Sequence, residues 1–224
     1  TLRNQAWRGS FTIIESMIQA KLYQTYLASL LRGDKEACLN IVTTLLEDKV
    51  EIRELYTDLF QKSMYSVGEL WERNEISVAR EHLATAITEN MLSITYPHLF
   101  TGQQSEKKVI ISCTANEYHQ LGGKMVADIF ELHGWDAHFL GANTPVNELL
   151  KFLDEIQPDL IGLSLAVYFN VPALKVTLEA IHTHFKNLDI LVGGHAFVWG
   201  GTGLLKNYPG TNYIESLAHL EANL

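Results

Sequence analysis

The sequence predicts an α/β protein, with a helical bundle in the first hundred residues and a doubly wound parallel sheet after it. Three observations support this class. The N-terminal part repeats apolar residues at three- and four-residue steps, the C-terminal part alternates short apolar runs with amphipathic segments, and a polar stretch separates the two. With 224 residues, 47% hydrophobic and 19% charged, the chain is long enough to bury a core and has the composition of an ordered protein.

Four helices are expected in the N-terminal part. Residues 1–13 show no clear period and are expected to be a linker or tail. A helical period begins at Ile14, and the third helix carries a long apolar stripe that ends at Trp71. The helix boundaries depend on residues that stop or cap helices, which are Gly33, Asp34, Ser77 and Pro97. Because the connections are short, the four helices are expected to form a bundle over residues 14–100.

Residues 101–107 are polar, lack an apolar period, and are expected to link the bundle to a second domain, residues 108–224. The expected strands of this domain are residues 108–114, 136–141, 160–166, 189–193 and 211–214. The expected helices are residues 119–133, 145–156, 172–185 and 215–222. Strands separated by helices of this length predict a five-stranded, doubly wound parallel sheet of the flavodoxin-like (Rossmann-like) type. The first strand-to-helix turn lacks Gly-x-Gly-x-x-Gly, which argues against a nicotinamide cofactor.

Charge and composition exclude several classes of function. The net charge of −9 argues against a nucleic-acid-binding surface in this segment, because phosphate binding needs clustered Lys and Arg. No apolar run approaches the roughly 20 residues that span a bilayer, and no signal peptide is visible. Cys38 and Cys113 have no metal-type spacing, so we expect a cytoplasmic protein with reduced thiols.

Residues 117–122, Glu-Tyr-His-Gln-Leu-Gly, lie between the first expected strand and its helix. In an open parallel sheet, ligands bind at the loops that follow the carboxyl ends of the strands. There His119 presents an imidazole, Glu117 is available as its hydrogen-bond partner, and Gly122 allows close approach of a ligand. Taken alone, a loop histidine beside a carboxylate is more often an ordinary solvated residue.

Spacing makes the pattern more specific. After Gly122, 41 residues precede Ser164, and after Ala166 a further 26 precede Gly193-Gly194. This resembles the cobalamin-binding domain family, whose pattern is Asp-x-His-x-x-Gly, about 41 residues, Ser-x-Leu, about 26 to 28 residues, Gly-Gly. The positions that match the pattern are His119, Gly122, Ser164, Gly193 and Gly194. Two positions depart from it, since Glu117 replaces the family Asp and Ala166 replaces the family Leu.

The resemblance implies that His119 is the lower axial ligand of cobalt, with the cofactor's own dimethylbenzimidazole base displaced, and that Glu117 is the partner of His119. It implies that Ser164, Gly193 and Gly194 line a slot for the displaced nucleotide tail. The alternative for the two glycines is that they only make strand-to-helix turns. His195, which follows them, is a further candidate for contact with the cofactor.

The bundle carries a second pattern, Trp71, nine residues, then Glu81-His82. A buried Trp is usually core, and Glu-His on a helix is usually a solvated face. The spacing nevertheless resembles the light-sensing cobalamin regulators, in which the Trp covers the upper face of the corrin and the Glu and His approach the adenosyl group. In light-sensing members a His follows the Trp and can ligate cobalt after photolysis. Here that position is Glu72, so a second protein ligand is not expected from it.

The resemblance implies a sensory and regulatory cobalamin-binding module, a sensor or carrier rather than an enzyme. The implied cofactor is adenosylcobalamin, with methylcobalamin as the other form, and the implied signal is light. Its output would be a change of homo-oligomer or of an attached output domain or partner, and any direct role in transcription needs an upstream segment or a partner. Two alternatives stay open: a corrinoid protein that carries methyl groups between methyltransferases, and a relative that binds another tetrapyrrole, haem or a bilin.

Overall fold

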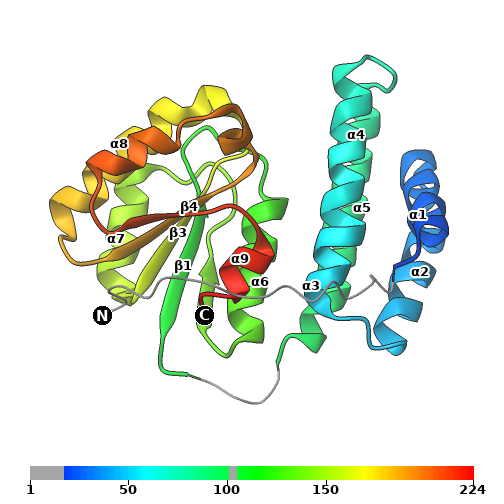
Figure 1. Ribbon diagram of the computed structural model, residues 1–224, viewed down its shortest axis with the longest axis horizontal. Coiled ribbons are helices and arrows are strands. Elements are labelled where there is room, and N and C mark those ends of the chain that lie inside the picture. The colour runs from blue at the N-terminus through cyan, green and yellow to red at the C-terminus, as the bar shows by residue number, and fades with distance from the viewer. Residues whose placement is uncertain (1–17, 101–104) are drawn as a thin grey trace.

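The computed structural model describes residues 18–100 and 105–224, and it has a bundle of helices beside a sheet that is covered by helices on both faces (Figure 1). The predicted α/β class is confirmed. The two expectations at the N-terminus, a tail over residues 1–13 and a helix that begins at Ile14, lie outside the described residues, as do residues 101–104 of the expected linker.

The bundle has four helical segments. They are α1 (Ala20–Arg32), α2 (Lys35–Glu47), the continuous run α3 (Ile52–Glu54), η1 (Leu55–Gln61) and α4 (Lys62–Glu72), and α5 (Val78–Thr95). Gly33 ends α1 in the left-handed conformation, with φ +78°, as expected of a C-terminal glycine. Asp34 and Ser77 cap α2 and α5 by accepting hydrogen bonds from backbone N–H groups. A short 3-10 turn, η2 (Tyr96–His98), follows α5 and contains the expected stop at Pro97.

The third segment differs from the expectation in one respect. Its η1 portion is a seven-residue π-helix, which the apolar period does not reveal. Four side chains of this portion are buried, and these are Leu55, Tyr56, Leu59 and Phe60. A π-helical stretch rotates the residues after it relative to an ideal α-helix. The orientation of α4, which carries Trp71, therefore depends on this stretch.

The second half of the chain forms a five-stranded, all-parallel sheet of order β2-β1-β3-β4-β5. The strands are β1 (Lys108–Cys113), β2 (Asp136–Phe139), β3 (Leu160–Ser164), β4 (Asp189–Gly193) and β5 (Thr211–Ile214). The helices are α6 (Leu121–Leu132), α7 (Val146–Ile156), α8 (Val171–His184) and α9 (Leu217–Glu221), with 3-10 turns η3 (Tyr168–Asn170), η4 (His195–Trp199) and η5 (Thr202–Asn207). All the expected strands and helices of this half are present. The strand order reverses between β1 and β3, and ligands bind at such a reversal.

The bundle shares a hydrophobic core with the sheet. One cluster joins buried bundle residues such as Tyr56 and Leu92 to Ile111 of β1 and Phe130 of α6. The second cluster lies on the opposite face of the sheet, under α7 and α8. Accordingly, α6 and α9 lie between the sheet and the bundle, and α7 and α8 cover the far face (Figure 1).

Buried polar contacts reinforce this junction. The hydroxyl of Tyr56 donates to Asp128 Oδ2 of α6 at 2.8 Å and lies 2.7 Å from Thr95 Oγ1 of α5. Lys124 forms an ion pair with Asp128 one helical turn away. Arg53 of α3 pairs with Glu221 of α9. The helices of the bundle are thus held by both apolar and polar contacts to α6, the helix that follows the His119 loop, and by an ion pair to α9.

Candidate cofactor site

The side chains of Glu117 and His119 form a hydrogen-bonded pair in the loop between β1 and α6. Glu117 Oε1 lies 2.6 Å from His119 Nδ1, and the same oxygen accepts the backbone N–H of His119 at 3.0 Å. An ionised carboxylate can only accept hydrogen bonds, so Nδ1 carries the proton when the ring is neutral. Nε2, the other ring nitrogen, then holds the free lone pair.

The second carboxylate oxygen of Glu117 is bound to the loop after β3. Oε2 accepts backbone N–H groups from Ala166 at 3.0 Å and Val167 at 2.9 Å, and the side-chain amide of Asn170 at 3.2 Å. The side chain of Glu117 is fully buried. Burial alone would raise its pKa, but the hydrogen bonds from His119, Val167 and Asn170 outweigh burial and lower the pKa to about 2. Glu117 is therefore an ionised carboxylate at neutral pH.

His119 faces outward from this buried partner, and its side chain is 62% exposed. Its hydrogen bond to Glu117 raises the pKa of the imidazole, partial burial opposes the rise, and the charges of Glu117 and Glu81 add to it. Nε2 forms no hydrogen bond with any residue among 18–100 and 105–224. An oriented imidazole with one nitrogen buried against a carboxylate and the other open is a suitable axial ligand for a metal held in a planar cofactor.

The other expected positions of the sheet lie side by side at its carboxyl edge. Ser164, the last residue of β3, pairs in register with Cys113 of β1 and with Gly193 of β4. Gly123, near the start of α6, packs over both strands, since a Cβ added there would lie 3.4 Å from Ser164 Cβ and 3.5 Å from Cys113 Sγ. The structure therefore brings Ser164 and Gly193 together near the start of α6.

The structure explains the absence of a side chain at Gly193 and Gly194, but not at Gly122. A Cβ at Gly193 would lie 2.8 Å from the carbonyl oxygen of Ile214, and one at Gly194 would lie 2.2 Å from that of Leu165. Gly194 also has φ +119°, which L side chains rarely adopt. Backbone packing therefore suffices to explain both residues. Gly122 is different, since a Cβ there would meet no heavy atom of the described chain within 4 Å apart from its chain neighbours and the backbone of α6.

The residues expected to cap the site lie at the turn between α4 and α5. Trp71 is on the last turn of α4 and is 46% exposed. Glu81, on the first turn of α5, is 20% exposed and accepts a hydrogen bond from Thr85 at 2.9 Å. His82 lies 3.5 Å from Glu81 and is 73% exposed. Of the three, Glu81 is close enough to His119 to raise its pKa. No hydrogen bond or ring contact joins Trp71 or His82 to the His119 loop among the residues that the structure describes.

Several contacts of the loop could not be read from the motif. Asn170 closes the far side of Glu117, and Gln120 donates to Glu89 of α5 at 2.9 Å. The ring of His195, which follows the paired glycines, lies 4.7 Å from the ring of Tyr65 on α4. Asn170 could have been found from the sequence, because it is a polar residue in the loop after β3 and so lies at the same sheet edge as His119. The contacts of Gln120 and His195 join the sheet edge to the bundle and had no signal in the sequence.

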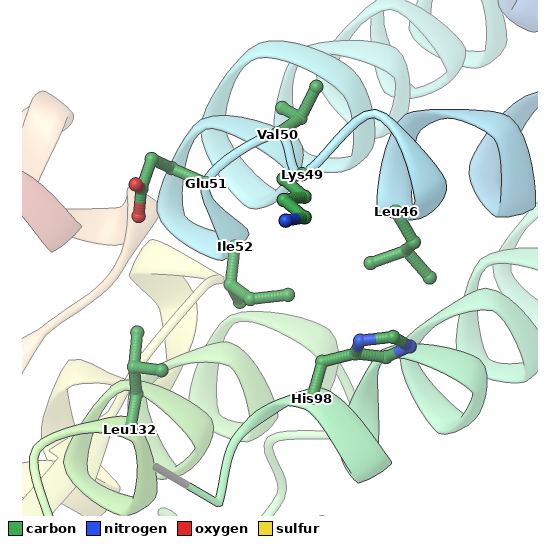
Figure 2. Close-up of a pocket in the computed structure, with 7 residues that line it drawn as sticks. All are labelled: Leu46, Lys49, Val50, Glu51, Ile52, His98 and Leu132. Atoms are coloured by element: carbon green, nitrogen blue, oxygen red, sulfur yellow. The ribbon is translucent and has the colours of Figure 1, made fainter.

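A separate hollow lies at the opposite end of α6. Figure 2 shows its lining, which includes Leu46, Ile52, His98 and Leu132, and its volume is about 230 Å³. Leu132 ends α6, whereas the His119 loop precedes the first residue of that helix. The hollow contains none of the expected site residues.

The fold and the site define a cofactor-binding module in which one histidine is offered from the edge of a flavodoxin-like sheet. Two family models described as B12 binding domains match the chain, over residues 22–95 and 107–215. The chain belongs to this cobalamin-binding family. It is a cobalamin-binding module, and its cofactor is a corrinoid.

Similar proteins include corrinoid proteins and transcriptional repressors. Dimethylamine corrinoid protein 1 of Methanosarcina acetivorans is 21% identical over 182 residues, which are 80% of this chain and 85% of that protein. The HTH-type transcriptional repressor CarA of Myxococcus xanthus is 31% identical over 126 residues, 55% of this chain and 42% of the repressor. The chain thus matches less than half the length of that repressor. The structure of the Methanosarcina barkeri monomethylamine corrinoid protein has the same fold, with a TM-score of 0.79 at 12% identity, over 91% of this chain and 96% of that one. No helix in the described part of the chain is long and apolar enough to cross a membrane.

Proposed function

We propose that this chain is a sensory module that binds adenosylcobalamin and responds to light. The observation that carries the proposal is a hydrogen bond between the His119 loop and α5, the helix that carries Glu81 and His82 of the Trp-x9-Glu-His pattern. Gln120, the residue after His119, donates to Glu89 of α5 at 2.9 Å. The charge of Glu81 also raises the pKa of His119, although 37 residues separate the two in the sequence. A cofactor held on His119 would therefore face the bundle.

Below the cofactor, we propose that His119 Nε2 is the axial ligand of cobalt. Glu117 fixes the ring by accepting from Nδ1 and raises its basicity as a ligand. Ser164, Gly193 and Gly194 line the slot for the nucleotide tail, supported by their shared position at the carboxyl edge of β3 and β4. Gly122, whose missing side chain no protein contact explains, leaves room at the start of α6.

Above the cofactor, we propose that Trp71 covers the corrin and that Glu81 and His82 face the adenosyl group. The hydroxyl groups of a ribose can donate hydrogen bonds to a carboxylate and can form hydrogen bonds with an imidazole. A methyl group forms no such bonds. Bound adenosylcobalamin supplies a cobalt–carbon bond that light breaks. Loss of the adenosyl group would remove the contacts of Trp71 and Glu81 with it. The bundle would then favour a different position relative to the sheet. We propose that an oligomeric contact, or an output domain or partner, responds to that change.

The second candidate is a carrier of methyl groups for a methyltransferase system. Its support is the match to dimethylamine corrinoid protein 1, which covers most of both chains. A carrier would use His119 in the same way, but it would have no use for Glu81 and His82 opposite the cobalt. The two candidates therefore differ in their preference for the upper ligand.

The test is an absorption spectrum of the purified protein with adenosylcobalamin, in darkness and after green light, followed by size-exclusion chromatography. We expect a base-off, His-on spectrum that converts irreversibly in light, together with a change in elution volume. His119→Ala should lose the His-on form, and Trp71→Ala should weaken binding of the adenosyl form. The matched control is His98→Ala, because His98 is exposed at the distant hollow.

Equal binding of methyl and adenosyl forms, with no light-driven change in assembly, would favour the carrier. Unchanged adenosylcobalamin binding and photochemistry in Trp71→Ala would remove the support for the sensor.

A further inference from the structure

Gly68 lies inside α4, where a glycine destabilises a helix relative to alanine. Apart from its chain neighbours and the backbone of its own helix, a Cβ added to Gly68 would meet no heavy atom of the described chain within 4 Å, and the φ of Gly68 does not lie in the positive range. Gly194, in contrast, is required by its φ and by the carbonyl oxygen of Leu165. Neither the backbone nor the packing of the described protein explains the glycine at position 68.

The position of Gly68 on the helix indicates what it faces. Tyr65, Gly68 and Trp71 are three residues apart, so each is turned about 60° from the one before it around the axis. Ser63 and Val67 mark the buried face of α4, whereas Tyr65 and Trp71 are 44% and 46% exposed. Gly68 therefore lies between two exposed aromatic side chains, on the solvent-facing half of α4.

The ring contact of Tyr65 shows which part of the molecule lies beside the strip of α4 formed by Tyr65, Gly68 and Trp71. Tyr65 lies 4.7 Å from His195, which directly follows Gly193 and Gly194 at the carboxyl edge of the sheet. The strip of α4 that carries Gly68 therefore borders the edge of the sheet that carries the proposed cofactor site. It presents two aromatic rings with a gap between them where any other residue would have a side chain.

We infer that Gly68 is a size-determining residue for the upper ligand of the cofactor. A large, flat group such as the adenine of an adenosyl ligand would lie over Gly68, where an added Cβ meets open space, and would pack against the rings of Tyr65 and Trp71. A side chain at position 68 fills the gap and excludes the large ligand more than a small one. This inference rests on the proposed function, and it names the residue that distinguishes adenosylcobalamin from cobalamins with small upper ligands.

The test compares the wild-type chain with Gly68→Ala and Gly68→Leu, each titrated with adenosylcobalamin and with hydroxocobalamin in darkness. We expect Gly68→Leu to weaken adenosylcobalamin binding by roughly tenfold or more and hydroxocobalamin binding by much less, since overfilling a packed site is costly. Gly68→Ala should act in the same direction with a smaller effect. In the cofactor-free protein, Gly68→Ala should melt at the wild-type temperature or above it.

The matched controls are Gly203→Ala and Gly203→Leu. Gly203 lies in η5, also has no heavy atom within 4 Å of an added Cβ, and has no positive φ. We expect both variants to bind both cobalamins as the wild type does. Four outcomes would overturn the inference: unchanged adenosylcobalamin binding by Gly68→Leu, equal loss of both cobalamins, a lower melting temperature for cofactor-free Gly68→Ala, or failure of the wild-type chain to bind either cobalamin. The last outcome overturns the proposed function as well and differs from the others because the unmodified chain itself fails.

Discussion

Glu117 Oε2 accepts the backbone N–H of Ala166 at 3.0 Å, so the two residues that depart from the cobalamin-binding pattern contact each other. Ala166 contributes only its main chain, and the bond does not depend on which side chain stands there. Glu117 is one methylene longer than the family Asp, and its carboxylate bonds both to His119 and to the loop after β3. The Glu is therefore an effective partner for His119.

In Glu117→Asp, the carboxylate should no longer extend from the His119 loop to the loop after β3. We expect the carboxylate to keep only one set of partners, because a side chain one methylene shorter cannot span both loops in the same backbone. Leaving the partly buried N–H groups of Ala166 and Val167 unpaired costs on the order of 1 kcal/mol, which urea unfolding of the cofactor-free protein would measure. Glu117→Gln, which keeps the length and removes the charge, is the comparison. Stability equal to that of the wild type in Glu117→Asp would show that the backbone adjusts to the shorter acid.

The Glu117–His119 pair should make stability depend on pH in two opposite ways. The pKa of Glu117 falls from an ordinary 4.5 to about 2, so its contribution is complete above about pH 4.5 and is lost as the pH falls toward 2. The contribution is on the order of 3 kcal/mol. The pKa of His119 is raised above 6.5, so its contribution is complete below pH 6.5 and is lost as the pH rises through that higher value.

The pair is therefore most stabilising between about pH 4.5 and 6.5. Urea unfolding of the cofactor-free wild type and of Glu117→Gln, repeated at several pH values, would measure it. The difference between the two proteins should be largest in that window and should shrink on the acid side. A difference that does not change with pH would contradict the assignment of an ionised Glu117.

Gly194→Ala should destabilise the fold whether or not cofactor is present. A Cβ would lie 2.2 Å from the carbonyl oxygen of Leu165, at a φ of +119° that alanine rarely adopts. We expect a loss of at least about 2 kcal/mol in the free energy of unfolding. Gly122→Ala is the matched comparison, since its Cβ meets open space, and it should unfold like the wild type. Wild-type stability in Gly194→Ala would mean that β3 and β4 can separate at this point.

The bond between Tyr56 and Asp128 should couple the bundle to the sheet. Burial raises the pKa of Asp128, and its contacts with Lys124 and Tyr56 oppose the rise, so each remaining partner matters. A double-mutant cycle with Tyr56→Phe and Asp128→Asn should give an interaction energy of about 0.5–3 kcal/mol. Additive effects of the two substitutions would mean that the shared apolar core alone holds the two parts together.

Much of the architecture could be predicted because its signals are local. Gly33, Asp34 and Ser77 stop or cap helices through their own backbone and side chains, so each boundary depends on a few neighbouring residues. The parallel sheet follows from the alternation of strands and helices. The π-helical η1 was not predictable, since its apolar residues have the same spacing as those of an α-helix, and packing against α6 selects among such forms.

For the site, the sequence by itself determined the family, the loop histidine and its acidic partner, because these lie two residues apart and in register with Ser164 and the paired glycines. Only the tertiary structure decided what surrounds them. The bonds from Ala166 and Asn170 to Glu117 join segments about 50 residues apart, and Gln120 bonds to Glu89 of the bundle. Such contacts depend on how strands and helices pack. A local sequence pattern does not show which distant segments will lie next to each other. The same holds for Gly68, whose significance lies in the space that the folded chain leaves beside it.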